Sequence, residues 1–88
     1  MTVLLQDILY KVSIRSVAGG TAIPVTDVQV DSRNIKPGSL FIAVKGSGLD
    51  GHQFIDKAIE NGAVAVLCET LPLSLRDGIV YVQAETVP

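Results

Sequence analysis

Apolar residues recur at helical spacing near the start of the chain and at strand spacing after it. From residue 4 to residue 12 they repeat every three to four positions, which predicts a helix over roughly Leu4 to Lys11 with Thr2 as its N-cap. Residues 14–17 are expected to form a short strand that ends before two glycines. Between residues 27 and 31, Val28 and Val30 alternate with polar residues, which predicts a half-buried strand with the valines as its apolar face.

The middle of the chain begins with a turn and a strongly apolar strand. Lys36-Pro37-Gly38-Ser39 has proline and glycine at the central positions of a type II turn. The apolar run Leu40–Val44 follows it and predicts a strand covered on both faces. A glycine-rich loop over Lys45–Gly51 then leads to the next element.

A helix is expected over about Gln53–Asn61, with Asn61-Gly62 as its C-terminal cap. Its expected buried face consists of Phe54, Ile55, Ala58 and Ile59. Two more apolar runs, Ala63–Cys68 and Ile79–Val82, predict further buried strands.

Strand, helix and strand joined by short links form a βαβ unit, whose strands are expected to be parallel with a right-handed crossover. A chain of 88 residues is long enough for one domain with a modest core. The predicted fold class is α/β, with a small mixed, mainly parallel sheet, flanking helices and one central βαβ unit.

Composition narrows the function classes. The net charge is −2 and the seven basic residues are scattered, which disfavours nucleic acid and anionic membranes as partners. No apolar run approaches the roughly 18 residues that span a bilayer, and no secretory signal is recognisable. The single cysteine, Cys68, excludes an internal disulfide and is expected to be buried. We expect a reducing, cytoplasmic setting and no metal site.

The sequence lacks the common motifs of a complete catalytic site. It has no G-x-x-x-x-G-K-[ST] phosphate loop, no G-x-S-x-G elbow, and only one histidine. We therefore expect no catalytic residue in this chain, and we expect any chemistry to lie on residues outside it.

Residues 46–51 read Gly46-Ser47-Gly48-Leu49-Asp50-Gly51, a literal G-x-G-x-x-G between a predicted strand and a predicted helix. Glu69 ends the next predicted strand about twenty residues on, as a dinucleotide-binding fingerprint requires. A single match to this pattern is not specific, and Asp50 places a carboxylate where phosphate would bind. A glycine loop that receives a pyrophosphate remains a physically sound reading.

Two short polar motifs flank this region. In Asp31-Ser32-Arg33, the side chains either shape a turn or offer a hydroxyl and a guanidinium to a ligand. In Asp50-Gly51-His52, the histidine either pairs with Asp50 and caps the helix or acts as a general base. Because no nucleophile lies nearby in sequence, a structural or ligand-positioning role is favoured for His52.

These motifs occur in a fixed order with further matching residues around them: Val30-Asp31-Ser32-Arg33, Lys36–Ala43, Gly46, Asp50-Gly51-His52, Phe54-Ile55, Ala58-Ile59, Gly62-Ala63 and Ala65–Leu67. The ordered set closely resembles the N-terminal domain of the Mur ligases of type E, the UDP-N-acetylmuramoyl-tripeptide synthetases of peptidoglycan biosynthesis. The resemblance is dense from Val28 to Glu69 and looser on either side.

The resemblance implies that residues 1–88 bind the UDP moiety of UDP-N-acetylmuramoyl-L-alanyl-D-glutamate in the bacterial cytoplasm. It implies a central ATPase domain and a C-terminal domain outside this chain. ATP and magnesium would serve the full-length enzyme, with no cofactor in this chain. The reaction would add L-lysine or meso-diaminopimelate through an acyl phosphate.

The resemblance also implies which residues contact the nucleotide: Val30, Ser32, Ser47, Gly48 and Leu49. Four further residues match motif positions and are expected to shape the site: Asp31, Arg33, Asp50 and His52.

Three alternatives remain. The Mur ligases of type F share much of this pattern, and Ala43-Val44-Lys45-Gly46 is close to their version, although they tend to have Thr where this chain has Ser32. A free-standing dinucleotide-binding or oxidoreductase domain would use the glycines of residues 46–51 together with Glu69. A regulatory or interaction module could use the same scaffold without catalysis.

Overall fold

The computed structural model describes residues 3–10, 13–44 and 50–85. Its main sheet has five strands in the order β2-β7-β6-β5-β4. Their bounds are β2 Ile14–Ala18, β7 Val80–Ala84, β6 Ala65–Cys68, β5 Leu40–Ile42 and β4 Val28–Gln29. A second, two-stranded sheet pairs β1 (Val3–Leu4) with β3 (Pro24–Val25) in antiparallel fashion.

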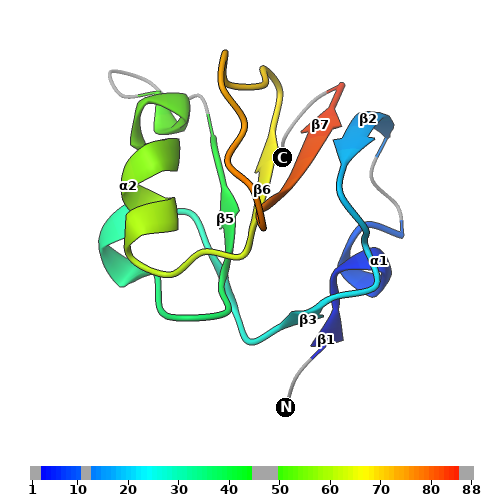
Figure 1. The fold of residues 1–88 in the computed structure, drawn as a ribbon, viewed down its shortest axis with the longest axis horizontal. Coiled ribbons are helices and arrows are strands. Elements are labelled where there is room, and N and C mark those ends of the chain that lie inside the picture. The colour runs from blue at the N-terminus through cyan, green and yellow to red at the C-terminus, as the bar shows by residue number, and fades with distance from the viewer. Residues whose placement is uncertain (1–2, 11–12, 45–49, 86–88) are drawn as a thin grey trace.

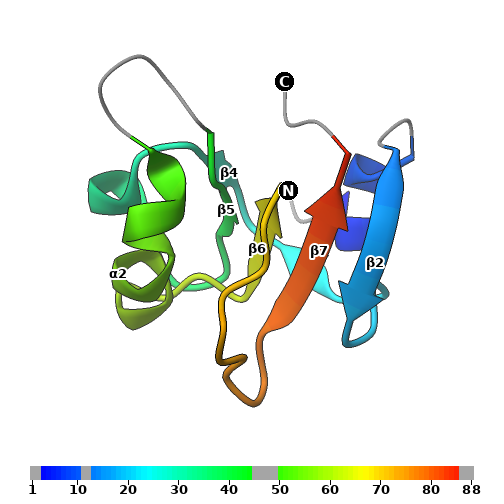
Figure 2. The same ribbon diagram turned by 90° about the horizontal axis from the view of Figure 1, so that it is seen from above.

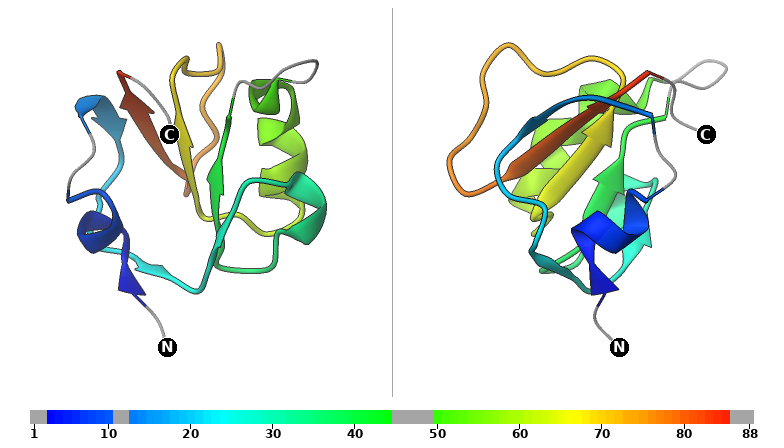
Figure 3. Two further views of the ribbon diagram at one scale, coloured as in Figure 1. Left: turned by 180° about the vertical axis from the view of Figure 1, so that it is seen from behind. Right: turned by 90° about the vertical axis from the view of Figure 1, so that its right-hand side faces the viewer.

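The main sheet is mixed and mainly parallel, as the sequence predicted. β4, β5, β6 and β7 run parallel to one another, and only β2 is antiparallel to its neighbour β7. The parallel pair β5 and β6 is connected through helix α2 (Ile55–Glu60), which confirms the βαβ unit. The connection from β6 to β7 extends away from the sheet (Figure 3, right).

The two helices cover opposite faces of this sheet (Figures 1, 2 and 3). Helix α1 (Leu5–Ile8) packs with one set of strand side chains, among them Leu40, Leu67 and Val82. Helix α2 packs with the alternate set, among them Phe41, Val66 and Tyr81. Each central strand contributes to both cores, which is why its sequence is a continuous apolar run. Among the described residues, no helix is long and apolar enough to cross a membrane.

The first helix is shorter than predicted, and the strand before it was missed. The helix begins at Leu5 because Val3–Leu4 pairs with β3, and its N-cap is Leu4 without a side-chain cap. Backbone carbonyls outside the helix accept from its first N–H groups: Leu5 N donates to Ile23 O at 2.8 Å. Thr2, the predicted cap, lies outside the described residues.

The predicted turn and helix end are confirmed. Gly38 has φ +92°, and Ser39 N donates to Lys36 O at 3.0 Å, as a type II turn requires. Gly62 has φ +119°, and its N–H donates to Ile59 O at 3.1 Å at the end of α2. Strand limits differ by one or two residues from prediction. For example, β5 ends at Ile42 and β6 begins at Ala65.

The prediction for β4 had the right alternation and the wrong face. Val28 and Val30 are exposed, at 42% and 61%, while Asp27 and Gln29, which alternate with them, are partly buried. Asp27 is satisfied there, because its carboxylate accepts hydrogen bonds from Gln29 and from the fully buried Ser39. The Gln29 amide, followed by the Ser39 hydroxyl, lowers the pKa of Asp27 below its usual value. Because Asp27 and Gln29 satisfy their polar groups on the inner side of β4, the two valines face outward.

Candidate functional site

Two short 3₁₀ turns stand at the carboxyl ends of neighbouring parallel strands. Turn η1 (Ser32–Asn34) follows β4, and turn η2 (Gly51–Phe54) follows β5 and leads into α2. Ligands of open α/β sheets bind in this position, outside the carboxyl ends of the strands. The turns contain the two polar motifs that the sequence singled out.

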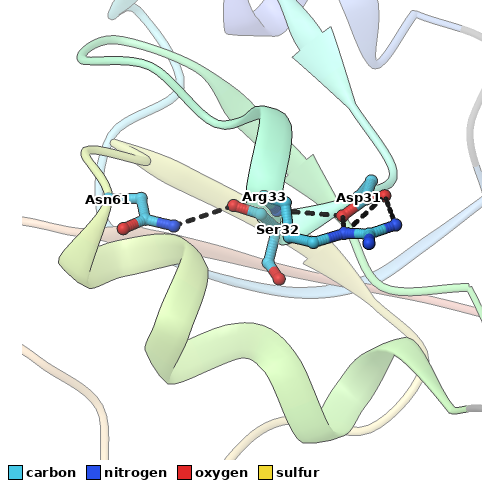
Figure 4. Close-up of polar contacts among 4 residues, drawn as sticks. All are labelled: Asp31, Ser32, Arg33 and Asn61. Carbon is cyan, nitrogen blue, oxygen red and sulfur yellow. Dashed lines mark hydrogen bonds and ion pairs between the residues drawn. The ribbon is translucent and has the colours of Figure 1, made fainter.

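Asp31 is the N-cap of η1, and its carboxylate accepts hydrogen bonds from both the backbone and the guanidinium of Arg33 (Figure 4). One carboxylate oxygen accepts from Arg33 N at 2.9 Å, and the other accepts from Arg33 Nη2 at 2.7 Å. The Arg33 side chain, followed by its backbone N–H, lowers the pKa of Asp31 to about 2. The Arg33 side chain is 86% exposed, yet the Nε–Nη2 edge of its guanidinium is occupied by Asp31. Both residues therefore shape the turn before they meet any ligand.

Ser32 lies at the inner side of η1 and is held by its main chain. Asn61, at the end of α2, donates from Nδ2 to Ser32 O at 2.9 Å. Ser32 is only 7% exposed, and its hydroxyl points away from the Asp31 carboxylate (Figure 4). Among the described residues nothing is hydrogen-bonded to Ser32 Oγ, so this hydroxyl can donate to or accept from a ligand.

Turn η2 has the same kind of cap as η1: an aspartate, Asp50, accepts a hydrogen bond from the backbone of the basic residue two positions later, His52. Asp50 is the N-cap and accepts from His52 N at 2.9 Å, and the Nδ1 atom of His52 lies 2.7 Å from the same oxygen. The other ring nitrogen, Nε2, accepts from Glu69 N at 3.1 Å and Thr70 N at 3.2 Å. These partners assign the neutral tautomer with the proton on Nδ1. His52 thus connects η2 to the end of β6.

Gly51 sits where two backbone segments touch. Its N–H donates to Val44 O at 2.8 Å. A Cβ at this position would lie 2.7 Å from Val44 N and 2.9 Å from Val44 O, closer than side chains approach backbone atoms. The close approach accounts for glycine here without any need for a positive φ.

A half-open pocket of about 770 Å³ lies between the two turns. Its described lining consists of Val30, Asp31, Ser32, Arg33, Val44, Gly51 and Phe54. The structure therefore brings together four of the residues predicted from the sequence. Asp50 and His52 are not in this lining; they flank Gly51 and hydrogen-bond to each other. Ser47, Gly48 and Leu49, the other predicted contacts, lie outside the described residues.

Sequence reasoning missed Phe54 and Val44. Phe54 was expected on the buried face of a helix that starts at Gln53, but α2 starts at Ile55 and Phe54 is 36% exposed. The position of Phe54, three residues after Gly51, could have revealed its place in the site, because residues i and i+3 of a 3₁₀ turn lie on the same side.

The described residues contain no group of three histidine, cysteine or carboxylate side chains that could hold a metal ion. Glu69, the acidic residue of the dinucleotide hypothesis, engages its neighbours through its backbone: its N–H donates to His52, and its carbonyl accepts from Gln83 Nε2 at 3.0 Å.

Residues 24–86 match the model of the Mur ligase family, catalytic domain. The chain belongs to the Mur ligase family.

Curated relatives carry a common name, UDP-N-acetylmuramoyl-L-alanyl-D-glutamate–2,6-diaminopimelate ligase. The relative from Chlorobium phaeobacteroides is 45% identical over 92% of this chain, and that from Cytophaga hutchinsonii is 52% identical over 77%. The matches cover 16% and 14% of those two proteins, so the chain spans about one sixth of the length of its relatives.

Solved structures agree on the fold. A MurF from Acinetobacter baumannii aligns with 98% of this chain and 18% of its own at a TM-score of 0.79, with 18% sequence identity, which is a likeness of fold alone. A structure of a UDP-N-acetylmuramoyl-L-alanyl-D-glutamate–2,6-diaminopimelate ligase aligns with 81% of this chain and 14% of its own at a TM-score of 0.59 and 32% identity.

Proposed function

We propose that this Mur ligase chain is a domain, residues 1–88, that binds the UDP moiety of UDP-N-acetylmuramoyl-L-alanyl-D-glutamate. The observation that carries the proposal is the pocket between η1 and η2, whose lining includes Val30 and Ser32. The names of the curated relatives supply the substrate and indicate 2,6-diaminopimelate as the amino acid that the whole ligase adds.

The chemistry of the pocket suits a nucleotide. Val30, Val44 and Phe54 give apolar walls, and Ser32 offers a hydroxyl at the inner end. One hydrogen bond from this hydroxyl to an uncharged ligand group would contribute roughly 0.5–1.5 kcal/mol. In the proposal, residues Ser47, Gly48 and Leu49 add contacts, mainly through backbone N–H groups, and Arg33 stays a shaping residue beside its partner Asp31.

In this proposal ATP and magnesium bind outside residues 1–88. The sequence has no phosphate loop, and the described part holds no cluster of metal-binding side chains. We therefore assign ATP and magnesium to the central domain of the full-length enzyme, and the incoming amino acid to its C-terminal domain. In this proposal the chain acts in the bacterial cytoplasm as a substrate anchor and ligates nothing by itself.

A second candidate is the same role in a Mur ligase of type F. It is favoured by the match to a MurF ligase from Thermotoga maritima in complex with ADP, at 40% identity over 60% of this chain and 12% of its own, with a TM-score of 0.55. An assay of the full-length enzyme separates the two: diaminopimelate consumption supports type E, and D-alanyl-D-alanine consumption supports type F.

Ligand-observed NMR on the 88-residue chain tests the binding itself. Saturable binding of UDP and of UDP-N-acetylmuramoyl-L-alanyl-D-glutamate is expected, with tighter binding of these two than of NAD. Preference for NAD would reject the proposal in favour of the dinucleotide-binding alternative.

Ser32→Ala tests the hydroxyl. Loss of one hydrogen bond should weaken UDP binding about two- to tenfold in the same titration, without a change in thermal stability. The matched control is Ser74→Ala, because Ser74 is exposed and lies outside the pocket lining. Equal UDP affinity of the Ser32 variant and the control would remove Ser32 from the site.

A further inference from the structure

The two phenylalanines of this chain have opposite environments. Phe41 is fully buried in the core beneath α2, whereas Phe54 is 36% exposed and lines the pocket. The partial exposure of a large aromatic side chain next to a buried core position needs a reason, because full burial of a phenylalanine would stabilise the fold.

The 3₁₀ turn gives the structural cause. In η2 the residues at positions i and i+3 eclipse each other, so Phe54 lies on the same side as Gly51. Both residues line the pocket, and Gly51 has no side chain to cover the ring. The core positions of α2 are taken instead by Ile55 and Ala58, which are 3% and 0% exposed.

The other residues that line the pocket are partly aliphatic and partly polar. Val30 and Val44 are aliphatic, and Asp31 and Arg33 neutralise each other through their ion pair of 2.7 Å. Ser32 then contributes a hydroxyl that binds no other described residue. An occupant that suits these walls is flat and apolar on its faces and carries hydrogen-bonding groups on its edge, as a nucleobase does.

We propose that Phe54 is a stacking surface for the pyrimidine base of the UDP moiety and a determinant of nucleotide affinity. This inference rests on the proposed function, and it assigns a contact that neither the sequence motifs nor the comparisons provide.

Two variants of Phe54 test the contact in UDP titrations followed by NMR. Phe54→Leu keeps an apolar side chain but removes the aromatic face, and it should weaken UDP binding about tenfold. Phe54→Tyr keeps the face and should bind UDP as the wild type does. Thermal melts verify that both variants are folded. A Phe54→Leu variant with wild-type UDP affinity would overturn the stacking role.

A tryptophan at position 54 gives a direct signal, because the chain contains no tryptophan of its own. UDP should change the fluorescence of Phe54→Trp saturably, and ribose 5-phosphate, which lacks a base, should not. The control is Leu73→Trp, since Leu73 is fully exposed and lies outside the lining of this pocket. Unchanged Phe54→Trp emission at UDP concentrations that saturate the NMR shifts would overturn the inference.

These outcomes separate the inference from the proposed function. If the wild-type chain binds UDP and Phe54→Leu binds it equally well, only the stacking role fails. If the wild-type chain itself does not bind UDP, the proposed function fails and the inference fails with it.

Discussion

The turns η1 and η2 are built in the same way and fixed to the fold differently. Each begins with an aspartate N-cap of nearly the same conformation, φ −113° and ψ 119° at Asp31 against φ −108° and ψ 116° at Asp50. In each, the basic residue two positions later pairs with that aspartate at 2.7 Å. The residue between them, Ser32 or Gly51, lines the pocket.

The difference lies in what the basic residue does with its other atoms. The Arg33 side chain is 86% exposed, and within the described part of the chain its guanidinium donates hydrogen bonds to Asp31 alone. The His52 side chain is 16% exposed and also accepts from two backbone N–H groups at the end of β6. The same local motif therefore forms a surface turn in one case and a brace between two elements in the other.

The largest effect is expected from Gly51→Ala. Because the added Cβ would meet backbone atoms of Val44 that cannot yield, unfolding free energy should fall by about 3 kcal/mol. Chemical denaturation measures this. Gly20→Ala is the control, since a Cβ at Gly20 meets nothing within 4 Å, and it should be close to neutral. Similar stabilities of the two variants would show that the Val44–Gly51 contact is loose.

His52→Ala should come next. It leaves the N–H groups of Glu69 and Thr70 without the acceptor that the ring provides, which should cost about 2 kcal/mol in a denaturant titration. The control is Gln53→Ala, an exposed neighbour in the same turn. A loss no greater than that of the control would mean that His52 does not brace η2.

Arg33→Ala should have a much smaller effect on stability than His52→Ala, because the Asp31–Arg33 pair is exposed to solvent. Thermal melts of the two variants side by side, with Arg15→Ala as a second exposed arginine variant, make the comparison. If Arg33→Ala destabilised the chain as much as His52→Ala, the contrast between the turns would be wrong.

The smallest effect concerns the pH dependence of η1. The folded-state pKa of Asp31, about 2, lies below its ordinary value of 3.8, so the ionised carboxylate stabilises the folded state. This stabilisation is complete above the ordinary pKa and is lost as pH falls through the folded pKa. The deficit of Asp31→Asn relative to wild type should therefore be present at neutral pH and shrink between pH 3.8 and pH 2. A deficit independent of pH in this window would show that the ionised Asp31 carboxylate does not stabilise the folded state.

The sheet could be predicted from the sequence because its central strands are continuous apolar runs separated by a helix signal. The phase of β4 could not, because alternation alone does not say which face is buried, and Asp27 finds partners in the buried Ser39 and the partly buried Gln29. The pairing of β1 with β3 was missed because strands of two residues carry no periodicity.

The candidate site, like the sheet, could be predicted from the sequence only in part. Asp31-Ser32-Arg33 and Asp50-Gly51-His52 were found because turn chemistry is local and visible in sequence. Phe54 was missed because a 3₁₀ turn precedes α2 and turns the ring out of the helical pattern. The partners of His52 at the end of β6 lie 17 and 18 residues away and depend on the fold.

The most direct test of the account is a map of UDP binding on the backbone amides of the 88-residue chain by two-dimensional NMR. The account predicts the largest saturable shifts at Ser32, Arg33, Val44, Gly51 and Phe54, and none at the exposed residues 73–78. Saturable shifts centred outside the pocket between η1 and η2, or no shifts at millimolar UDP, would contradict it.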